Sequence, residues 1–284
     1  MIDNNVNKHV LGVTRCGDSL FRWGTRTYIM GIINLSPDSF SGDGYVSVEA
    51  ALQKACVMVE EGADMIDVGG ESTRPNAAPV SVNEEAGRVI PFIRQACRLI
   101  KVPISVDTYK YEVATQALAA GASMINDISG LKMQPEIVKL AADKHIPVVL
   151  TSNERGRSVI NIVESVIGQL RELVLMAKRA GVEQQDIIVD PGIGFGKSQA
   201  QNLEILRRLD ELKVLQRPIL LGTSRKSFIT NVLNLSAEGR LYGTAASVAT
   251  GIIKGADIVR VHDVKQMSLI SRMTDTIVRS SVAE

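Results

Sequence analysis

The stretch DPGIGFGKS, residues 190–198, resembles a phosphate-binding loop in its composition. A P-loop needs a glycine five positions before the glycine of its Gly-Lys-Ser end, and Pro191 stands there instead, without an N–H group and with a fixed φ. The dinucleotide-binding fingerprint G-x-G-x-x-G also fails, because the third glycine of the series, Gly196, comes two residues after Gly194 and not three. Asp190, followed by proline and glycines, projects from a constrained turn, and we expect it to bind a ligand.

Other polar residues follow short apolar runs that are rich in isoleucine and valine. Carboxylates and amides dominate the middle of the chain, and cations gather toward its end. These residues are Asn34, Asp67, Glu71, Asp107, Asn126, Asp127, Thr151, Ser152, Asp190, Ser224, Arg225, Lys226, Arg260, His262 and Asp263. Carboxylates and amides pair with the N–H, amino and carbonyl groups of a heterocycle, whereas Arg, His and Lys suit phosphate oxygens. The pattern predicts a ligand with a planar, donor-rich part and an anionic part.

Some of these residues also fit a structural role. Asp107 is as well placed to cap a following helix as to bind a ligand. For Asn126, too, a structural role and ligand binding are about equally supported. His262 could be a core histidine, but in a strand it shares a face with Arg260, and the pair favours an anion site. The run SRKS could lie on the solvated surface, but it follows the apolar ILLG, which favours the rim of a pocket.

The apolar runs themselves predict the architecture. They are YIMGIINLS, DMIDVGG, PISVDT, SMINDIS, PVVLTS, DIIVDPG, PILLGTS and DIVRVHD, and helix-like stretches separate most of them. Continuous apolar runs are typical of strands buried on both faces. Eight such strands with helices between them, over about 250 residues, predict a (β/α)8 TIM barrel, which would bring the strand-end residues to one mouth. A doubly wound sheet is the main competitor, but it needs a glycine fingerprint after its first strand.

Further segments complete the predicted domain. Residues 11–29 predict an N-terminal β-hairpin that caps the barrel. Because no linker divides the chain, we expect one domain over residues 1–284, with its core at about 28–264. Two polar loops, residues 34–45 and 69–81, are rich in Ser, Pro, Asp and Gly, and we expect them to act as lids over the mouth.

Composition narrows the class of protein. The 284 residues carry a formal net charge of +1, so there is no electrostatic footprint for nucleic acid or for an anionic membrane. The polar start lacks the core of a signal peptide, and no apolar run reaches membrane-spanning length. Cys16, Cys56 and Cys97 show no metal-binding spacing, and we expect Cys56 and Cys97 to be buried reduced thiols. A cytoplasmic location fits best.

Seven blocks of the sequence then point to a family. MGIINLSPDSFSGDG, GADMIDVGGESTRP, ISVDTYK, INDISG, DPGIGFGKS, LLGTSRKSF and RVHDV resemble, in order and spacing, the signature blocks of the dihydropteroate synthases, from about Tyr28 to Val264. The resemblance implies a transferase of folate biosynthesis on a TIM barrel. It would join 6-hydroxymethyl-7,8-dihydropterin pyrophosphate to 4-aminobenzoate with the help of Mg²⁺, and would be a homodimer formed through late barrel helices.

The resemblance also implies roles for individual residues. The pterin would be bound by Asp107, Asn126, Asp190, Phe195 and Lys226, the pyrophosphate by Thr73, Arg260 and His262, Mg²⁺ by Asn34, and 4-aminobenzoate by Phe40, Arg74, Pro75 and Ser227. Among these, Asp107, Asp190, Lys226 and Arg260 would be catalytic. An arylamine is a neutral nucleophile at pH 7, so the difficult step is departure of pyrophosphate, which cations assist.

The chain departs from the family pattern after its fifth apolar run. Thr151-Ser152-Asn153 stands where the family usually has Met-His-Met, and the following loop is short. The first methionine normally packs against the pterin, so the change could weaken pterin binding, alter substrate preference or be tolerated. A pterin-binding homologue without synthase activity therefore stays open. A methyltransferase that passes a folate methyl group to a corrinoid protein has no use for SRKSF and RVHD.

Overall fold

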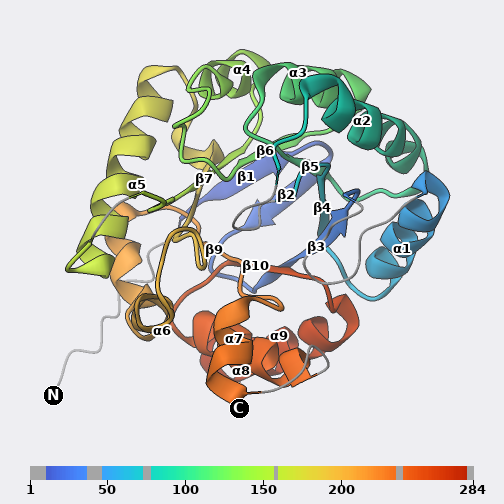
Figure 1. Ribbon diagram of the computed structural model, residues 1–284. Coiled ribbons are helices and arrows are strands. Elements are labelled where there is room, and N and C mark those ends of the chain that lie inside the picture. Colours follow the sequence, from blue (N-terminus) through green and yellow to red (C-terminus); the bar gives the residue numbers. More distant parts are fainter. Residues whose placement is uncertain (1–10, 37–46, 73–77, 157–158, 235–238, 280–284) are drawn as a thin grey trace, which may run out of the picture.

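Eight parallel strands form the centre of the computed structural model, which describes residues 11–36, 47–72, 78–156, 159–234 and 239–279 (Figure 1). The strands are β3 (Tyr28–Asn34), β4 (Met65–Gly69), β5 (Ile104–Asp107), β6 (Met124–Asp127), β7 (Val148–Thr151), β8 (Ile187–Asp190), β9 (Leu220–Leu221) and β10 (Ile258–Val261). Their order is β8-β7-β6-β5-β4-β3-β10-β9. A parallel bridge between Val189 and Ile219 joins the two end strands and closes the ring. The predicted barrel and its eight strands are confirmed.

Helices surround this barrel (Figure 1). They are α1 (Val48–Glu60), α2 (Val82–Leu99), α3 (Tyr111–Ala120), α4 (Ile137–Lys144), α5 (Ile162–Arg179), α6 (Gln199–Arg207), α7 (Ser227–Leu233), α8 (Arg240–Ile253) and α9 (Val264–Arg279), with 3-10 turns at η1 (Gln184–Asp186) and η2 (Leu209–Leu215). In α1, the Ser47 side chain caps the first turn, and Leu52 and Ala55 face the sheet. Within the described residues, no helix is long and apolar enough to cross a membrane.

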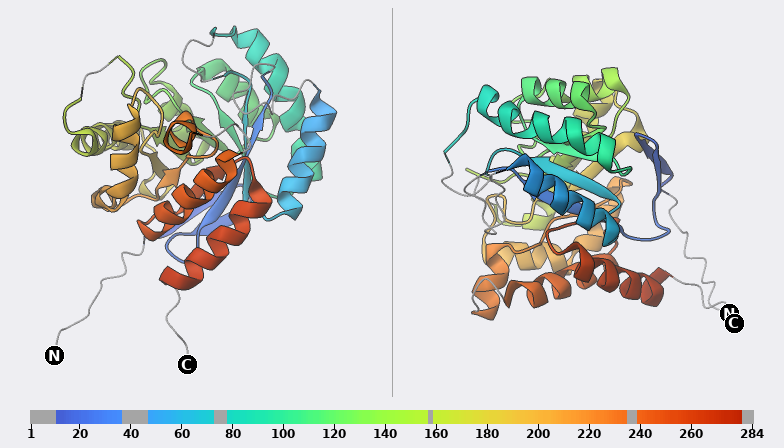
Figure 2. Two further views of the ribbon diagram at one scale, coloured as in Figure 1. Left: turned by 60° about the horizontal axis from the view of Figure 1, so that its bottom comes forward. Right: turned by 90° about the vertical axis from the view of Figure 1, so that its right-hand side faces the viewer.

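An antiparallel hairpin, β1 (Val13–Cys16) with β2 (Ser19–Arg22), precedes the barrel. It covers the end of the barrel opposite the mouth, as the right-hand view of Figure 2 shows. Phe21 and Trp23 pack edge-on against Tyr28, with ring centroids 4.9 and 5.4 Å away, and the Trp23 indole donates a 2.8 Å hydrogen bond to Thr14. The predicted cap is confirmed, and it seals the apolar floor of the barrel.

The inside of the barrel changes from apolar to polar toward the mouth. Inward side chains near the hairpin form one apolar cluster, which includes Met30, Met65, Met124, Val149, Ile188, Leu220 and Ile258. Because side chains alternate along a strand, the residue two positions further on five of these strands also faces inward. Those residues are Asp67, Asn126, Thr151, Asp190 and Arg260. The strands thus present a polar level directly above an apolar floor.

The cysteines correct one expectation. Cys97 is exposed and Cys56 is only half-buried, whereas Cys16, in the hairpin, is completely buried. In α2 the neighbouring Ala96 faces the sheet, and one residue turns a helix by about 100°, so Cys97 points to the side. An apolar neighbourhood in sequence therefore did not imply burial at this position.

Candidate active site

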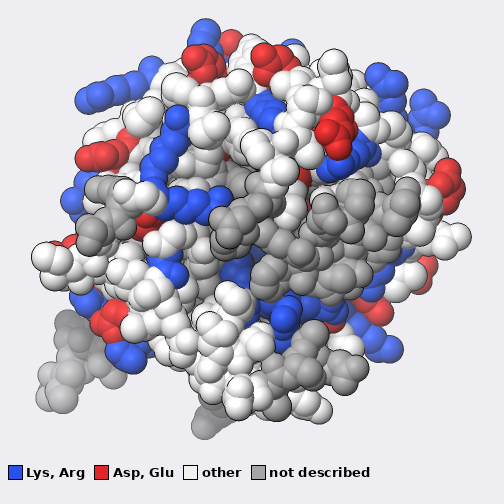
Figure 3. All heavy atoms as spheres, in the orientation of Figure 1, with Lys and Arg blue, Asp and Glu red and all other residues white. Residues whose placement is uncertain are grey.

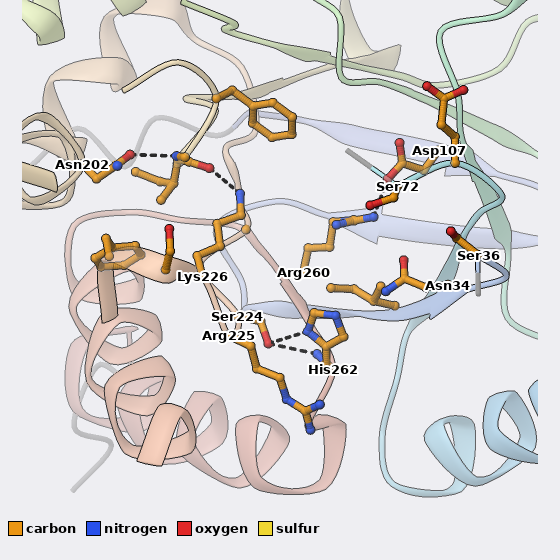
Figure 4. Close-up of a pocket in the computed structure, with 18 of the residues that line it drawn as sticks. Asn34, Ser36, Ser72, Asp107, Asn202, Ser224, Arg225, Lys226, Arg260 and His262 are labelled. Atoms are coloured by element: carbon orange, nitrogen blue, oxygen red, sulfur yellow. Dashed lines mark hydrogen bonds and ion pairs between the residues drawn. The ribbon is translucent and has the colours of Figure 1, made fainter. Parts of the chain in front are cut away.

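A cavity opens at the carboxyl ends of the strands, where the sequence predicted the ligand. Its lining includes seven of the predicted site residues, which are Asn34, Asp107, Phe195, Lys226, Ser227, Arg260 and His262. Figure 4 shows several of their side chains turned toward one another from separate strands. Lys and Arg side chains lie around the hollow on this face (Figure 3). The barrel therefore brings together residues that are far apart in the sequence, such as Asn34 and His262, which are more than two hundred positions apart.

Arg260 links two carboxylates across the mouth. Its Nε donates to Asp67 Oδ2 at 2.6 Å and its Nη2 donates to Asp107 Oδ2 at 2.5 Å. Asn126 Nδ2 donates to the same Asp67 oxygen at 3.0 Å. Burial raises the pKa of Asp107 to about 7, although Arg260 opposes the shift. Burial disfavours the charge of Arg260 too, but the two carboxylates outweigh it and raise its pKa.

The structure excludes one of the two roles left open for Asp107, which is capping of the following helix. The helix that follows begins with Lys110 at its N-cap position, so Asp107 does not cap it. Asp107 instead faces the cavity beside Arg260. Asp67 belongs to the same group; the sequence placed it among the polar residues of the apolar runs but assigned it no role.

The glycine-rich turn holds Asp190 beneath the cavity. Asp190 Oδ1 accepts a 2.7 Å hydrogen bond from the Gly192 N–H, and its side chain is buried. Burial raises the pKa of Asp190, while Lys226 acts to lower it. Gly192 has a φ of +68°, and an added Cβ there would lie 1.8 Å from the carbonyl oxygen of Ser152. Asp190 and Asn126 are both buried on the inward side of the barrel strands, but neither is among the residues that line the cavity.

The lysine of Gly-Lys-Ser has an internal use that the sequence did not reveal. Lys197 Nζ donates to the carbonyl oxygens of Ser152 at 2.9 Å, Gly192 at 3.0 Å and Phe195 at 3.3 Å. Burial lowers the pKa of Lys197 to about 7. Ser198, the last of the three, caps α6 in a capping box. These residues therefore hold the turn in shape and are not oriented toward a phosphate in the cavity.

Phe195 lies between two cations at the mouth. Lys226 Nζ is 4.9 Å from the ring centroid, and Arg155 Cζ is 5.3 Å from it. Lys226 also donates a hydrogen bond to the carbonyl oxygen of Ile193. Burial lowers the pKa of Lys226 to about 8, against the effect of Asp190. Arg155 lines the cavity as well, and the sequence offered no signal for it beyond its place after the unusual Thr-Ser-Asn block.

His262 is held as a neutral hydrogen-bond donor. The Ser224 hydroxyl accepts the His262 backbone N–H at 3.1 Å and lies 2.9 Å from Nδ1 of the ring. We assign the hydroxyl proton to this second bond, which leaves the ring proton on Nε2. Burial, followed by the nearby cations Arg225 and Arg260, lowers the pKa of His262 to about 3. A neutral imidazole with an N–H group suits a phosphate oxygen.

Asn34 ends β3 at the mouth and lines the cavity. In the part of the chain that the structure describes, no group of three or more His, Cys, Asp or Glu side chains could hold a metal ion. Mg²⁺ usually takes few protein ligands and completes its shell with water and substrate phosphates. A single amide oxygen beside an anion site fits that mode of binding.

Four predicted residues fall outside the described residues. These are Phe40, Thr73, Arg74 and Pro75. Ser36 and Ser72, which precede those two segments in the chain, both line the cavity.

The Thr151-Ser152-Asn153 block is held by hydrogen bonds to its surroundings. The Ser152 hydroxyl donates to Gln169 Oε1 of α5 at 2.7 Å, and Asn153 Nδ2 donates to the Ile128 carbonyl oxygen at 3.0 Å. Gln169 Nε2 donates in turn to the Asn153 carbonyl oxygen at 3.2 Å. Ser152 and Asn153 therefore serve the connection between β7 and α5, whereas Thr151 faces the inside of the barrel.

Known proteins share this sequence and fold. Residues 30–262 match the family of pterin binding enzymes. The dihydropteroate synthase of Clostridium beijerinckii is 48% identical over 93% of this chain and 99% of its own length. A crystal structure of dihydropteroate synthase from Clostridium difficile, obtained in the presence of pteroic acid, is 46% identical, with a TM-score of 0.87 over 92% of this chain and 100% of that one. A structure of the Xanthomonas albilineans dihydropteroate synthase with 4-aminobenzoic acid is 38% identical, with a TM-score of 0.87 over 93% of this chain and 97% of that one.

Proposed function

The chain belongs to the dihydropteroate synthases, a group of pterin-binding enzymes, and we propose that it joins 6-hydroxymethyl-7,8-dihydropterin pyrophosphate to 4-aminobenzoate. The products are 7,8-dihydropteroate and pyrophosphate, so the protein is a transferase of folate biosynthesis. The observation that carries the assignment is the division of the site. The buried carboxylate and amide groups of Asp190 and Asn126 face the inside of the barrel, and Lys226, Arg260 and His262 line the cavity at its mouth.

The two parts of the substrate match the two parts of the site. The donor-rich edge of the pterin would lie against Asp190 and Asn126, with Asp107 beside it and Lys226 on the ring carbonyl. Lys226 would exchange the Ile193 carbonyl oxygen for that of the pterin. The pyrophosphate would meet Arg260 and the Nε2–H of His262.

Most of the remaining site residues would bind the second substrate, 4-aminobenzoate. Ser227, at the start of α7, lines the cavity and would contact the carboxylate of 4-aminobenzoate. Phe195 would lie beside the bound rings. Phe40, Thr73, Arg74 and Pro75 keep the roles that the family resemblance implies, with Thr73 on the pyrophosphate and the others around 4-aminobenzoate. The structure of a relative with 4-aminobenzoic acid supports this class of second substrate.

The chemistry is a substitution at the pterin methylene carbon. The arylamine nitrogen forms the new C–N bond, the C–O bond to pyrophosphate breaks, and the nitrogen releases its proton to solvent. As the leaving group departs, the methylene carbon becomes electron-poor, and the carboxylates of Asp107 and Asp190 stabilise the cationic pterin. Arg260, together with the N–H group of His262, stabilises the negative charge that collects on the pyrophosphate oxygens. No strong general base is needed.

Mg²⁺ is the cofactor that this site would use. Asn34 would supply the protein ligand, with pyrophosphate oxygens and water completing the shell. When bound, Mg²⁺ supplies positive charge to the leaving group.

We also propose that the protein works in the cytoplasm, as a single domain and as a homodimer. The exposed thiol of Cys97 and the half-buried thiol of Cys56 suit a reducing compartment. Apolar side chains exposed on α7, α8 and α9 support a second copy of the chain as the partner.

The direct test is release of pyrophosphate from the pterin substrate, with and without 4-aminobenzoate and with and without Mg²⁺. We expect release that depends on the arylamine, yields dihydropteroate and falls when Mg²⁺ is removed. Asp190→Ala should abolish pterin binding and therefore the release of pyrophosphate. Arg260→Ala should mainly weaken recognition of the pyrophosphate. Pterin binding without arylamine-dependent release would identify a homologue that has lost synthase activity. Unchanged turnover in either variant would contradict the assigned roles.

A further inference from the structure

Four buried side-chain oxygens inside the barrel have no hydrogen-bond partner among the described residues. They are Asp67 Oδ1 on β4, Ser105 Oγ on β5, Asn126 Oδ1 on β6 and Thr151 Oγ1 on β7. The four strands are consecutive neighbours in the sheet, and by strand alternation all four side chains face inward. Buried polar atoms in folded proteins are nearly always paired, so the set indicates a ligand or water with donor groups.

Thr151 lies between two residues already assigned to the pterin. Its strand β7 pairs with β6, which carries Asn126, and with β8, where Thr151 stands in register with Asp190. Val149, two residues earlier, belongs to the apolar floor, so the Thr151 side chain points inward at the level above it. The Thr151 side chain has no exposed surface.

The neighbours of Thr151 hold it in this position. Ser152 is anchored outward to Gln169 of α5, and its carbonyl oxygen receives the Lys197 ammonium. The Ser152 N–H donates to the Asp190 carbonyl oxygen at 2.9 Å, which joins the end of β7 to the glycine-rich turn. These bonds fix the end of β7 and so keep the Thr151 side chain on the inward face of the strand.

We propose that Thr151 determines specificity for the pterin, and that its hydroxyl hydrogen-bonds to the amino-bearing edge of the ring, directly or through one water. This inference rests on the proposed function. An amino group carries two N–H donors, and Asp190 lies beside Thr151 to accept one of them. A hydroxyl that is paired only in the complex favours heterocycles with the amino group and disfavours analogues without it, because the hydroxyl then stays buried and unpaired.

The competing account is that Thr151 only fills space. Valine has almost the same shape, so on that account Thr151→Val leaves the affinity for the pterin unchanged. If the hydroxyl is unpaired in the free protein and paired in the complex, the same substitution has two effects of opposite sign. It removes a buried unpaired oxygen, which stabilises the free protein, and it removes a hydrogen bond to the ligand, which weakens binding.

The test measures the Kd of 6-hydroxymethylpterin by calorimetry and the Tm of the unliganded protein for Thr151→Val, Thr151→Ser and Thr151→Ala. We expect Thr151→Val to raise Kd roughly fivefold and to raise Tm or leave it unchanged. Thr151→Ser should bind more tightly than Thr151→Ala, because serine keeps the hydroxyl that alanine lacks.

Other outcomes overturn the inference. A wild-type Kd in Thr151→Val, or equal affinities for the Ser and Ala variants, would show that the hydroxyl makes no bond to the pterin. A lower Tm in Thr151→Val with weaker binding would show that the hydroxyl is already paired in the free protein. Absence of pterin binding by the wild-type protein would refute the proposed function itself, and the inference with it.

Discussion

In the proposed mechanism, Asp107 and Lys226 both act through charges that their burial opposes. Burial raises the pKa of Asp107 to about 7 and lowers the pKa of Lys226 to about 8. Both groups therefore titrate near neutral pH, although their ordinary pKa values lie far apart. In the mechanism that we propose, the carboxylate stabilises a cationic pterin and the ammonium binds the ring carbonyl.

This pair predicts a narrow pH optimum. As pH falls through about 7, Asp107 takes up a proton and loses its negative charge, and as pH rises through about 8, Lys226 loses its proton. The value of kcat/KM for the pterin substrate should therefore fall on both sides of this range. In Lys226→Arg the alkaline limb should move upward, because arginine stays charged. The substrates titrate equally with both proteins, so an alkaline limb that stays in place would contradict the assignment to Lys226.

At the scale of residues, the sequence predicted which residues come together at the mouth, but it did not predict several of their hydrogen-bond partners. Asp107, Arg260 and His262 were found because each ends an apolar run. The bond from Arg260 to Asp67 joins residues 193 positions apart, and no local pattern encodes such a pairing. The role of Lys197 could not be predicted for a different reason. A lysine after a glycine gives no sign that its ammonium group will bind three carbonyl groups, which belong to its own turn and to the neighbouring strand end.

At the scale of elements, the glycine-rich turn depends on close contact between two strand ends. The turn after β8 lies against the end of β7, and Gly192 touches the Ser152 carbonyl group where no Cβ would fit. Lys197 binds carbonyl groups on both sides of this contact. The position of Asp190, which we propose to bind the pterin, therefore depends on glycine at this point.

We expect Gly192→Ala to impair catalysis severely. An added Cβ would lie 1.8 Å from the Ser152 oxygen, and the φ of +68° is itself unfavourable for alanine, so the turn must move away from β7. A shift of about 1 Å at a binding group costs on the order of 100-fold in rate, and we expect a loss of that size in kcat/KM.

The matched control is Gly168→Ala in α5, where no atom lies within 4 Å of the added Cβ. Alanine there should stabilise the protein by about 0.5–1 kcal/mol and leave kcat/KM unchanged. Steady-state kinetics and thermal unfolding of both variants make the comparison. Wild-type kinetics in Gly192→Ala would show that the turn tolerates displacement.

The places of the strands along the chain were easier to predict than the faces of elements. Isoleucine- and valine-rich runs located all eight barrel strands, because parallel strands are buried on both sides. The exposure of Cys97 was not foreseen, because a shift of one residue on a helix separates a core position from the surface. Thr151 is a similar case, since only the barrel shows that it faces inward between Asn126 and Asp190.

At the scale of the whole molecule, one side of the barrel exposes apolar side chains on three consecutive helices. They are Val232 and Leu233 on α7, Tyr242 and Ile253 on α8, and Leu269, Met273 and Ile277 on α9. On α9 the three residues are spaced four apart and share one face. Helices α8 and α9 lie side by side on the outside of the barrel (Figure 2). Exposed apolar groups of this kind mark interaction surfaces, and a second copy of the chain offers a matching one.

We expect Met273→Glu to separate the proposed dimer, because it places a charge in the middle of the apolar face of α9, where Met273 is 64% exposed. In analytical ultracentrifugation the wild-type protein should sediment at twice the chain mass of 30.7 kDa, and the variant at the chain mass. Met133→Glu is the control, because Met133 is equally exposed, at 62%, but precedes α4 on another side of the barrel. That variant should remain dimeric. The cavity is lined by a single barrel, so we expect monomeric Met273→Glu to retain pterin binding. A wild-type protein that sediments as a monomer, or a Met273→Glu variant that stays dimeric, would show that α9 is not the interface.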